Sequence, residues 1–239
     1  MKKITFVVAA AAASVVHAGS MGPVSTSSST PYLTSEASYT WPPYGGFTVN
    51  SYQRTISSQG WGGRLGAGMM YSYSETISLT GEIGGGYYGS KSQNLYNVNG
   101  QVASSGSFSV DGYDVLAGFI YKLNYFDVFF QGGFMLENIR TSYYNNLSDI
   151  YPGGLYSGFK TRSLNQTQAL PEIKVGGIYN VNPNWGIDVA YMHVFGNNNP
   201  HGSGQKSATF DGVYENTSVF GQNPTLDSVM FGLHYNFVM

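Results

Sequence analysis

The chain has 239 residues, of which 10% are charged and 15% aromatic, with 32 Gly, 20 Tyr, no Cys and a formal net charge of −2. A typical soluble domain carries about 25% charged residues, so this composition favours a protein that is solvated partly by lipid. The charge argues against a nucleic-acid partner, which needs an excess of Lys and Arg. The lack of Cys excludes disulfides, zinc–thiolate sites and thiol catalysis.

The N-terminus has the organisation of a secretory signal peptide. Lys2 and Lys3 precede an apolar run that ends at Val16, and Ala18 is the expected cleavage position. The run is too short to span a membrane as a helix. We therefore expect residues 1–18 to be a signal peptide and residues 19–30 to be a short periplasmic segment.

Eight segments of the remaining chain alternate between apolar and polar residues, which predicts strands with one lipid-facing and one lumen-facing side. The apolar side of each covers about 11 residues, or roughly 25 Å at a tilt of ~40°, which matches the apolar band of an outer membrane. In chain order, the expected strands are Pro31–Trp41, Trp61–Tyr71, Thr76–Tyr88, Phe108–Leu123, Phe126–Ile139, the two halves of the hairpin Ile173–Met192, and Thr225–Phe237.

The connections between these strands alternate between short and long. Outer-membrane barrels have short periplasmic turns and long outside loops. The pattern predicts an all-β fold, an eight-stranded antiparallel up-and-down transmembrane barrel over residues 31–239. The short turns are Ser72–Glu75, Asn124–Tyr125 and Asn182–Asn184, and the long loops are Pro42–Gly60, Gly89–Ser107, Tyr143–Gln166 and Gly196–Pro224.

The segment GGRLGAGMMYSYSETISLTGEIGGGYYG (Gly62–Gly89) and the closing run VMFGLHYNF have the texture of known outer-membrane barrels. In them the chain resembles the opacity-type and outer-membrane-protein-A-type eight-stranded barrels over its whole mature length. The resemblance implies the outer membrane of a Gram-negative bacterium, surrounded by lipid and lipopolysaccharide, and insertion by the barrel assembly machinery. Family members typically end on an aromatic residue that this machinery recognises, whereas here Phe237 is followed by Val238 and Met239.

Charged residues on the polar sides of the strands would face the lumen, out of reach of lipid. An eight-stranded barrel is only wide enough to be filled by its own side chains, so we expect a salt-bridged plug. A cation or proton path along the carboxylates is the alternative. The expected lumen charge network is Glu36, Arg64, Glu82, Lys122, Glu137, Glu172, Lys174 and Asp188.

Aromatic residues at the ends of the apolar sides predict girdles at the two membrane interfaces. The expected girdle residues are Trp41, Trp61, Tyr71, Tyr87, Tyr121, Tyr179, Trp185, Tyr191, Tyr235 and Phe237.

Some barrels that the chain resembles modify lipid A, which makes His193 and Ser228 candidate catalytic residues. Deacylases of this shape place their serine two positions after the histidine, and that position here is Phe195. We therefore expect no enzymatic activity and no catalytic residue, cofactor or metal.

The expected long loops are rich in Ser, Asn, Gly and Tyr, the chemistry of adaptable binding surfaces. They favour a structural or adhesin-like role with a host-surface or extracellular ligand, although passive loops fit the same composition. A narrow porin-like channel and a lipid A-modifying enzyme are the alternatives. A secreted lipocalin-like barrel would need a charged exterior, which 10% charged residues cannot cover.

Overall fold

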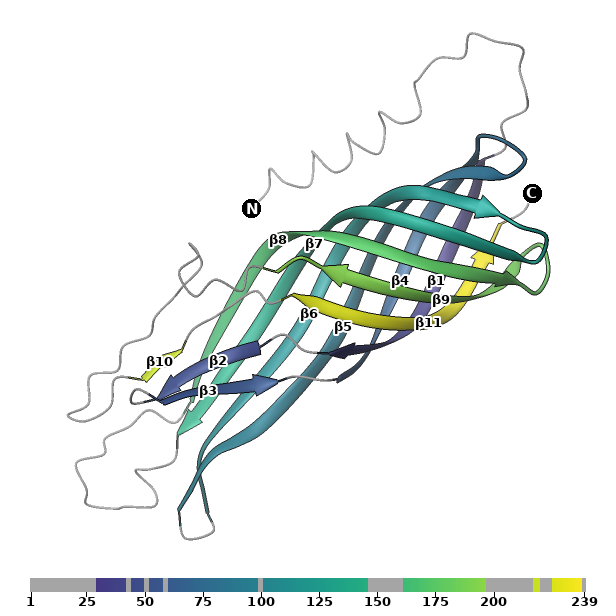
Figure 1. Cartoon of the computed structure of the whole chain (residues 1–239). Coiled ribbons are helices and arrows are strands. Elements are labelled where there is room, and N and C mark those ends of the chain that lie inside the picture. Colours follow the sequence, from purple (N-terminus) through teal and green to yellow (C-terminus); the bar gives the residue numbers. More distant parts are fainter. Residues whose placement is uncertain are drawn as a thin grey trace.

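In the computed structural model, eight antiparallel strands close into a barrel in the order β1-β11-β9-β8-β7-β6-β5-β4 (Figure 1). This confirms the predicted fold class. The structure describes residues 29–41, 44–49, 52–57, 60–98, 101–145, 161–196, 217–219 and 225–237. The expected signal peptide, residues 19–28 and the terminal Val238-Met239 lie outside these ranges.

The barrel strands fall into a short and a long group. The short group consists of β1 (Ser29–Trp41), β4 (Gly60–Ser72), β9 (Trp185–Val194) and β11 (Leu226–Asn236). The long group consists of β5 (Ile77–Val98), β6 (Gln101–Lys122), β7 (Phe126–Asn145) and β8 (Thr161–Asn180). Short turns connect neighbouring strands at one end of the barrel, here called the turn end, and the opposite end is the loop end.

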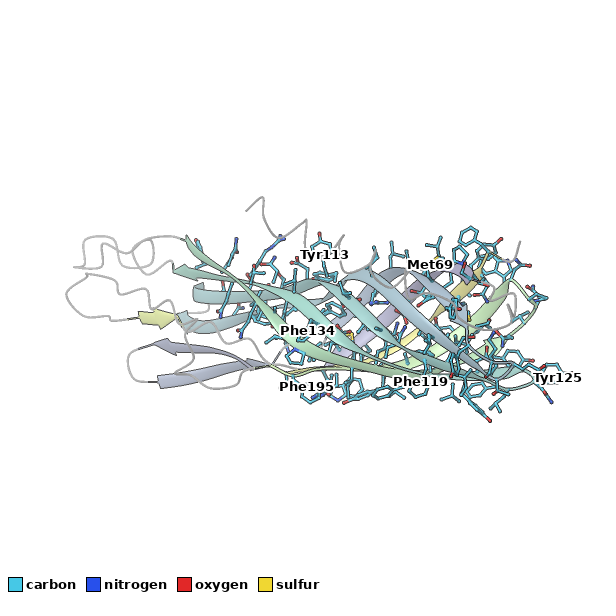
Figure 2. The ribbon with its side chains drawn as sticks, turned by 90° about the horizontal axis from the view of Figure 1, so that it is seen from above. Met69, Tyr113, Phe119, Tyr125, Phe134 and Phe195 are labelled. Atoms are coloured by element: carbon cyan, nitrogen blue, oxygen red, sulfur yellow. The ribbon has the colours of Figure 1, made fainter. Side chains whose placement is uncertain are left out.

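Side chains alternate across the barrel wall as the sequence predicts. In β1, for example, Thr34, Glu36 and Ser38 are buried inside, whereas Leu33 is exposed outside. Figure 2 shows outward side chains such as Met69 and Phe119 projecting from the wall. Exposed apolar side chains around the outside of the barrel favour a lipid environment, because monomeric soluble proteins rarely expose large contiguous apolar patches.

The long strands extend beyond the short ones as a four-stranded sheet, here called the protruding sheet (Figure 1). The predicted loops Gly89–Ser107 and Tyr143–Gln166 were therefore drawn too long, because much of each is strand. Apolar alternation ends where lipid ends, but backbone pairing between strands continues into water. For example, Asp111 on β6 and Thr167 on β8 lie in the parts of these strands that extend beyond the apolar band.

Gly89 marks the point where β5 leaves the barrel. Its φ is +112°, a conformation that favours glycine, and the pairing of β5 with β6 shifts register between Tyr87 and Ser90. A Cβ on Gly89 would lie 3.1 Å from the Cα of Gly60, the first residue of β4. The bulge therefore lets β5 bend past the end of β4.

A second, three-stranded sheet lies within the predicted loops Pro42–Gly60 and Gly196–Pro224. It pairs β2 (Tyr44–Val49) with β3 (Tyr52–Ser57) and with β10 (Thr217–Val219), so it connects the first and the last loop. Its strands are too short for alternation of apolar and polar residues to reveal them in the sequence. In Figure 1 this sheet lies at the loop end, beside the protruding sheet.

Candidate functional site

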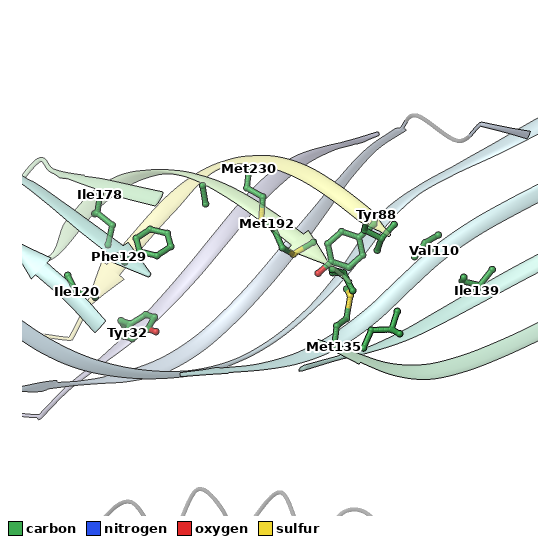
Figure 3. Close-up of a cluster of buried hydrophobic side chains, with 14 of the residues drawn as sticks. Tyr32, Tyr88, Val110, Ile120, Phe129, Met135, Ile139, Ile178, Met192 and Met230 are labelled. Atoms are coloured by element: carbon green, nitrogen blue, oxygen red, sulfur yellow. The ribbon is translucent and has the colours of Figure 1, made fainter. Parts of the chain in front are cut away.

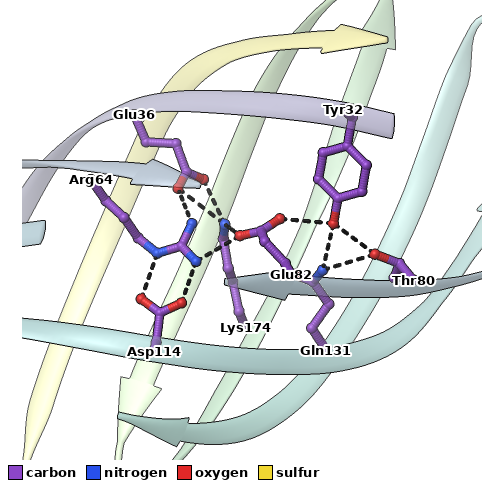
Figure 4. Close-up of polar contacts among 8 residues, drawn as sticks. All are labelled: Tyr32, Glu36, Arg64, Thr80, Glu82, Asp114, Gln131 and Lys174. Carbon is purple, nitrogen blue, oxygen red and sulfur yellow. Dashed lines mark hydrogen bonds and ion pairs between the residues drawn. The ribbon is translucent and has the colours of Figure 1, made fainter. Parts of the chain in front are cut away.

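A buried arginine organises the middle of the lumen (Figure 4). Arg64, on β4, donates from Nε and Nη2 to the two oxygens of Asp114 on β6, at 2.8 and 2.5 Å. Its Nη1 lies 2.9 Å from Glu36 Oε2 on β1, and its Nη2 lies 2.6 Å from Glu82 Oε1 on β5. The rigid fork of the guanidinium thus contacts three carboxylates on three different strands, which suits arginine and no other cation.

Lys174 reaches the same carboxylates from β8, on the far side of the lumen. Its Nζ lies 2.8 Å from Glu36 Oε1 and 3.6 Å from Glu82 Oε1. We call Glu36, Arg64, Glu82, Asp114 and Lys174 the central ion-pair cluster. All five side chains are buried, so each charge depends on its partners for stabilisation in place of water.

A hydroxyl and amide network continues the cluster toward the turn end. The hydroxyl of Tyr32 donates to Glu82 Oε2 at 2.9 Å and lies 2.7 Å from Thr80 Oγ1. Gln131 Nε2 approaches both hydroxyls, and the ring of Tyr32 stacks on His234 with centroids 4.7 Å apart. The lumen here is filled by side chains that bond one another.

Four of the eight predicted lumen charges therefore meet in one cluster, and Asp188 lies near Glu36, since a Cβ on Gly232 would lie 2.6 Å from Asp188 Oδ1 and 2.8 Å from Glu36 Cγ. Glu137, Glu172 and Asp188 are buried. Both oxygens of Glu172 and Oδ1 of Asp188 have no hydrogen-bond partner among the described residues. Lys122 is half-buried near the turn end, where its Nζ lies 3.4 Å from Ser72 Oγ.

Asp114 was not among the predicted lumen charges, although alternation places it on the lumen side. Gly84, which pairs in register with Asp114, is a sequence signal for this contact. A Cβ on Gly84 would lie 2.3 Å from Arg64 Nη2, so glycine leaves room for the guanidinium to reach this carboxylate.

Apolar side chains fill the lumen on the loop-end side of the cluster, which the sequence analysis did not predict. Met192 on β9 and Met230 on β11 are fully buried, as is Met135 on β7 (Figure 3). Val194 and Leu226 lie beside them at the loop ends of their strands. We call these five residues the methionine layer. Unbranched, polarizable methionines fit irregular space, which explains three of them in one layer.

A second apolar group lies on the turn-end side of the cluster. Ile120, Phe129 and Ile178 are buried near the turn ends of β6, β7 and β8, at the opposite end of the core from Val110 and Ile139 (Figure 3). The polar middle of the lumen is therefore bounded by apolar side chains on both sides. Such packing leaves the ion pairs no contact with bulk water.

The predicted girdle residues all lie on the outward face. Nine of them are exposed, with Trp61 the most exposed at 74%, and Tyr235 is half-exposed. Near the loop end, the Trp61 and Tyr39 rings lie 5.1 Å apart. Near the turn end, Trp185 and Tyr235 are 4.7 Å apart. Aromatic pairs at both ends match the amphipathic rings of two membrane interfaces.

Polar contacts on the outward face mark the limit of the apolar band toward the loop end. On one side of the barrel, Asp111 lies 3.4 Å from Arg140 Nη2 and accepts a hydrogen bond from Asn138. On the other side, Asp227 accepts a bond from the Tyr191 hydroxyl and lies 2.7 Å from His193 Nδ1. Charged and amide groups in this position belong at the level of lipid headgroups or water.

The two candidate catalytic residues lie on opposite sides of the barrel wall. His193 pairs in register with Asp227 and shares its outward face, so the next residue, Ser228, points into the lumen. Ser228 Oγ lies 2.7 Å from Thr40 Oγ1. A serine nucleophile needs its base within hydrogen-bond reach, and this pair lacks that geometry. Among the described residues, no group of three or more His, Cys, Asp or Glu side chains could hold a metal ion.

Within the described ranges, no helix is long and apolar enough to cross a membrane.

No protein-family model and no curated protein matches the chain. Among solved structures it is similar to the outer membrane protein OprG of Pseudomonas aeruginosa, with 12% identity over 88% of this chain and 97% of that one, and a TM-score of 0.46. It is also similar to Ail, the attachment invasion locus protein of Yersinia pestis, with 14% identity, 87% and 97% coverage and a TM-score of 0.42. These likenesses concern the fold alone.

Proposed function

Since the chain is an eight-stranded barrel of the outer-membrane type, we propose that it is a non-enzymatic surface protein that binds an extracellular partner at its loop end. It would reside in the outer membrane of a Gram-negative bacterium, with the turn end in the periplasm. The observation that carries the proposal is the burial of the inward side chains of the described strands: a barrel whose interior is filled by its own side chains has only its exposed end to offer a partner.

The packing of the lumen supports binding over conduction. The central ion-pair cluster lies between apolar side chains on both sides, and the buried residues of the methionine layer are 0% exposed. An ion that followed the carboxylates would have to cross these layers without water, at a cost of several kcal/mol. The porin-like alternative therefore requires a rearrangement of at least Met192 and Met230.

The loop end supports binding by its size and chemistry. The protruding sheet and the sheet of β2, β3 and β10 together form a structured projection beyond the apolar band. The segments that join these strands in the sequence are rich in Ser, Asn, Gly and Tyr. Rigid strands that carry such segments resemble the scaffold-and-loop organisation of binding proteins.

Among the residues that the structure describes, the enzyme alternative has no serine nucleophile beside its base. His193 and Asp227 form a histidine–carboxylate pair at the rim, but Ser228 faces the other side of the wall. If the pair nevertheless acted on lipid A, His193→Ala would abolish release of acyl chains from lipopolysaccharide. We expect the unsubstituted protein and the His193→Ala variant both to leave lipopolysaccharide unchanged over the same incubation.

The test of the proposed function combines the bilayer conductance of refolded full-length protein with the attachment of cells that express it. We expect no steady conductance in planar bilayers, and attachment of cells expressing the protein that is lost when residues 146–160 and 197–216 are shortened. The matched control is Arg140→Ala, which changes the rim and leaves both loops intact. Stable single-channel steps that change in size with Arg64→Ala would overturn the proposal in favour of a channel.

A further inference from the structure

The protruding sheet has two lateral edges, because the short strands end before the long ones. Pairing of β4 with β5 stops at Gly63 and Tyr87, so the loop-end half of β5 loses its neighbour on that side. Pairing of β9 with β8 stops at Val194 and Glu172, so residues 161–171 of β8 lose theirs. A free edge presents unpaired N–H and C=O groups and is a template for a further strand.

The edge formed by β5 is blunted in several ways. Its pairing with β6 shifts register after Tyr87, and again at Asn94 and Tyr96. Lys91 adds a charge in this half of the strand, and β3 lies close to β5. Bulges, charges and a covering element are the usual means by which proteins prevent an edge from pairing.

Over residues 163–171, the edge formed by β8 has no bulge and no charge, and no described strand pairs with it; Arg162 lies just before this stretch. The register of β8 with β7 runs from Thr161 to Tyr179 without a shift. The sequence from Ser163 to Pro171, SLNQTQALP, carries no charge. β9 ends at Val194, and Phe195 and Gly196, the described residues that follow it, are not part of a strand.

One hydrogen bond identifies the backbone groups that face the free side. Phe195 N donates to Pro171 O at 2.9 Å, so the carbonyl of Pro171 points toward β9. Successive residues of a strand direct their N–H and C=O groups to opposite sides. The odd-numbered residues Ser163, Asn165, Thr167 and Ala169 therefore face away from β7, and no described strand pairs with them. Pro171, which has no N–H, lies where an edge tolerates it.

We propose that residues 163–169, the β8 edge, bind an extended segment of a partner protein as an added antiparallel strand. This inference deepens the proposed function and rests on it. Because β8 runs toward the turn end, the added strand would run away from the membrane. Backbone bonds to the four odd-numbered residues would supply the affinity, and side-chain contacts on the two faces would supply the specificity.

The two faces of β8 define the chemistry of the partner. On the concave side, Gln166 and Gln168 are half-buried, and Leu170 and Ile139 beyond them are buried in the apolar cluster that includes Val110 and Phe108. On the convex side, Thr167 is exposed and donates to Asn138 Oδ1 at 3.3 Å. A fitting strand therefore carries uncharged residues on both faces, with an apolar residue near Leu170, and lacks proline.

The test uses a capped peptide of about seven alternating Thr and Val residues, long enough to span the edge. Amide hydrogen exchange of refolded protein in detergent micelles is measured with and without the peptide. We expect exchange at Asn165, Thr167 and Ala169 to slow by about tenfold, because each amide gains a hydrogen bond. The same peptide with every residue N-methylated can donate along neither side and should leave exchange unchanged.

Asn165→Pro and Asn165→Ala form a matched pair of variants. Proline removes an N–H that β7 does not use, so the barrel should fold, which an unchanged unfolding midpoint would verify. Asn165→Ala should keep peptide protection and Asn165→Pro should abolish it. Protection that persists in Asn165→Pro, or that falls on even-numbered residues, overturns the inference.

Cell attachment separates this inference from the proposed function. Attachment that is lost in Asn165→Pro and kept in Asn165→Ala supports both. Attachment that survives Asn165→Pro but is lost when the loops are shortened overturns the β8 edge and leaves surface binding in place. A full-length protein that never promotes attachment overturns the proposed function, whereas peptide protection at the edge would still support the edge as a strand-binding site.

Discussion

The central ion-pair cluster and the methionine layer fill neighbouring parts of one lumen by opposite means. In the cluster, Arg64 depends on three carboxylates at specific angles, and each carboxylate depends on it in turn. In the methionine layer, side chains contact one another without direction, and any apolar group of similar volume satisfies the same neighbours. The cluster thus determines which strands face each other, whereas the layer excludes water.

Arg64→Ala should have the largest effect on stability. It leaves Glu36, Glu82 and Asp114 buried with Lys174 as their only described cation, and removal of one partner from a buried ion pair costs about 3–5 kcal/mol. The measurement is guanidinium unfolding from lipid vesicles, followed by tryptophan fluorescence. Arg140→Ala is the control, because its ion pair with Asp111 is solvent-exposed and worth less than about 1 kcal/mol. Equal losses in the two variants would contradict the role given to the cluster.

Met192→Ala should destabilise the barrel by about 2–5 kcal/mol, because it opens a cavity in a fully buried layer. Met192→Leu keeps the volume and should cost less than about 1.5 kcal/mol. The same unfolding titration measures both, and bilayer conductance of the alanine variant tests whether the layer seals the lumen. A Met192→Leu variant as unstable as Met192→Ala would show that the layer requires methionine itself and not only an apolar side chain of similar volume.

Glu172→Gln should change stability in the opposite direction. Both oxygens of Glu172 lack a hydrogen-bond partner among the described residues, so an amide of the same shape removes a buried carboxyl group that no hydrogen bond stabilises there. We expect a gain of about 1 kcal/mol. Glu36→Gln, which weakens contacts to Arg64 and Lys174, should instead destabilise. A loss in Glu172→Gln would mean that this carboxylate has a cationic partner in the folded protein.

Lys122→Ala should have the smallest effect, within about 0.5 kcal/mol. The ammonium group is half-buried near the turn end and contacts Ser72 Oγ at only 3.4 Å. Lys174→Ala, which removes a buried lysine from the cluster, is the comparison variant and should cost several times more. Similar unfolding midpoints for both lysine variants would remove the distinction between cluster and periphery.

The sequence predicts the barrel well because lipid imposes a strict rule on one face of every strand. Leu33 and Glu36 could be assigned to opposite faces from alternation alone, and the structure places them so. The same rule says less about what fills the lumen. Alternation places Met135 and Met192 on the lumen side, but it does not show that the lumen changes from polar to apolar packing along its length.

Strand ends and side-chain partners were harder to predict. The strands β5 to β8 continue into water, where no hydrophobic pattern records them, so they were predicted to end near Tyr88 and Ile139. Asp114 was recognised as facing the lumen, but its contact with Arg64 depends on the shear of the barrel, which brings β4 and β6 side chains together across β5. Distances across a closed sheet are not encoded in local spacing.

The ion pair between Glu36 and Lys174 joins residues that are 138 positions apart in the chain. Glu36 lies on the first barrel strand, which pairs with the last one, β11, to close the sheet. An incomplete ring of strands would hold these charges without their partners, so the pair forms only when the first and last strands meet. Contacts of such long sequence separation slow folding and make it cooperative. Closure of the barrel and neutralisation of its interior are then a single late event during insertion, and a truncated chain should gain neither.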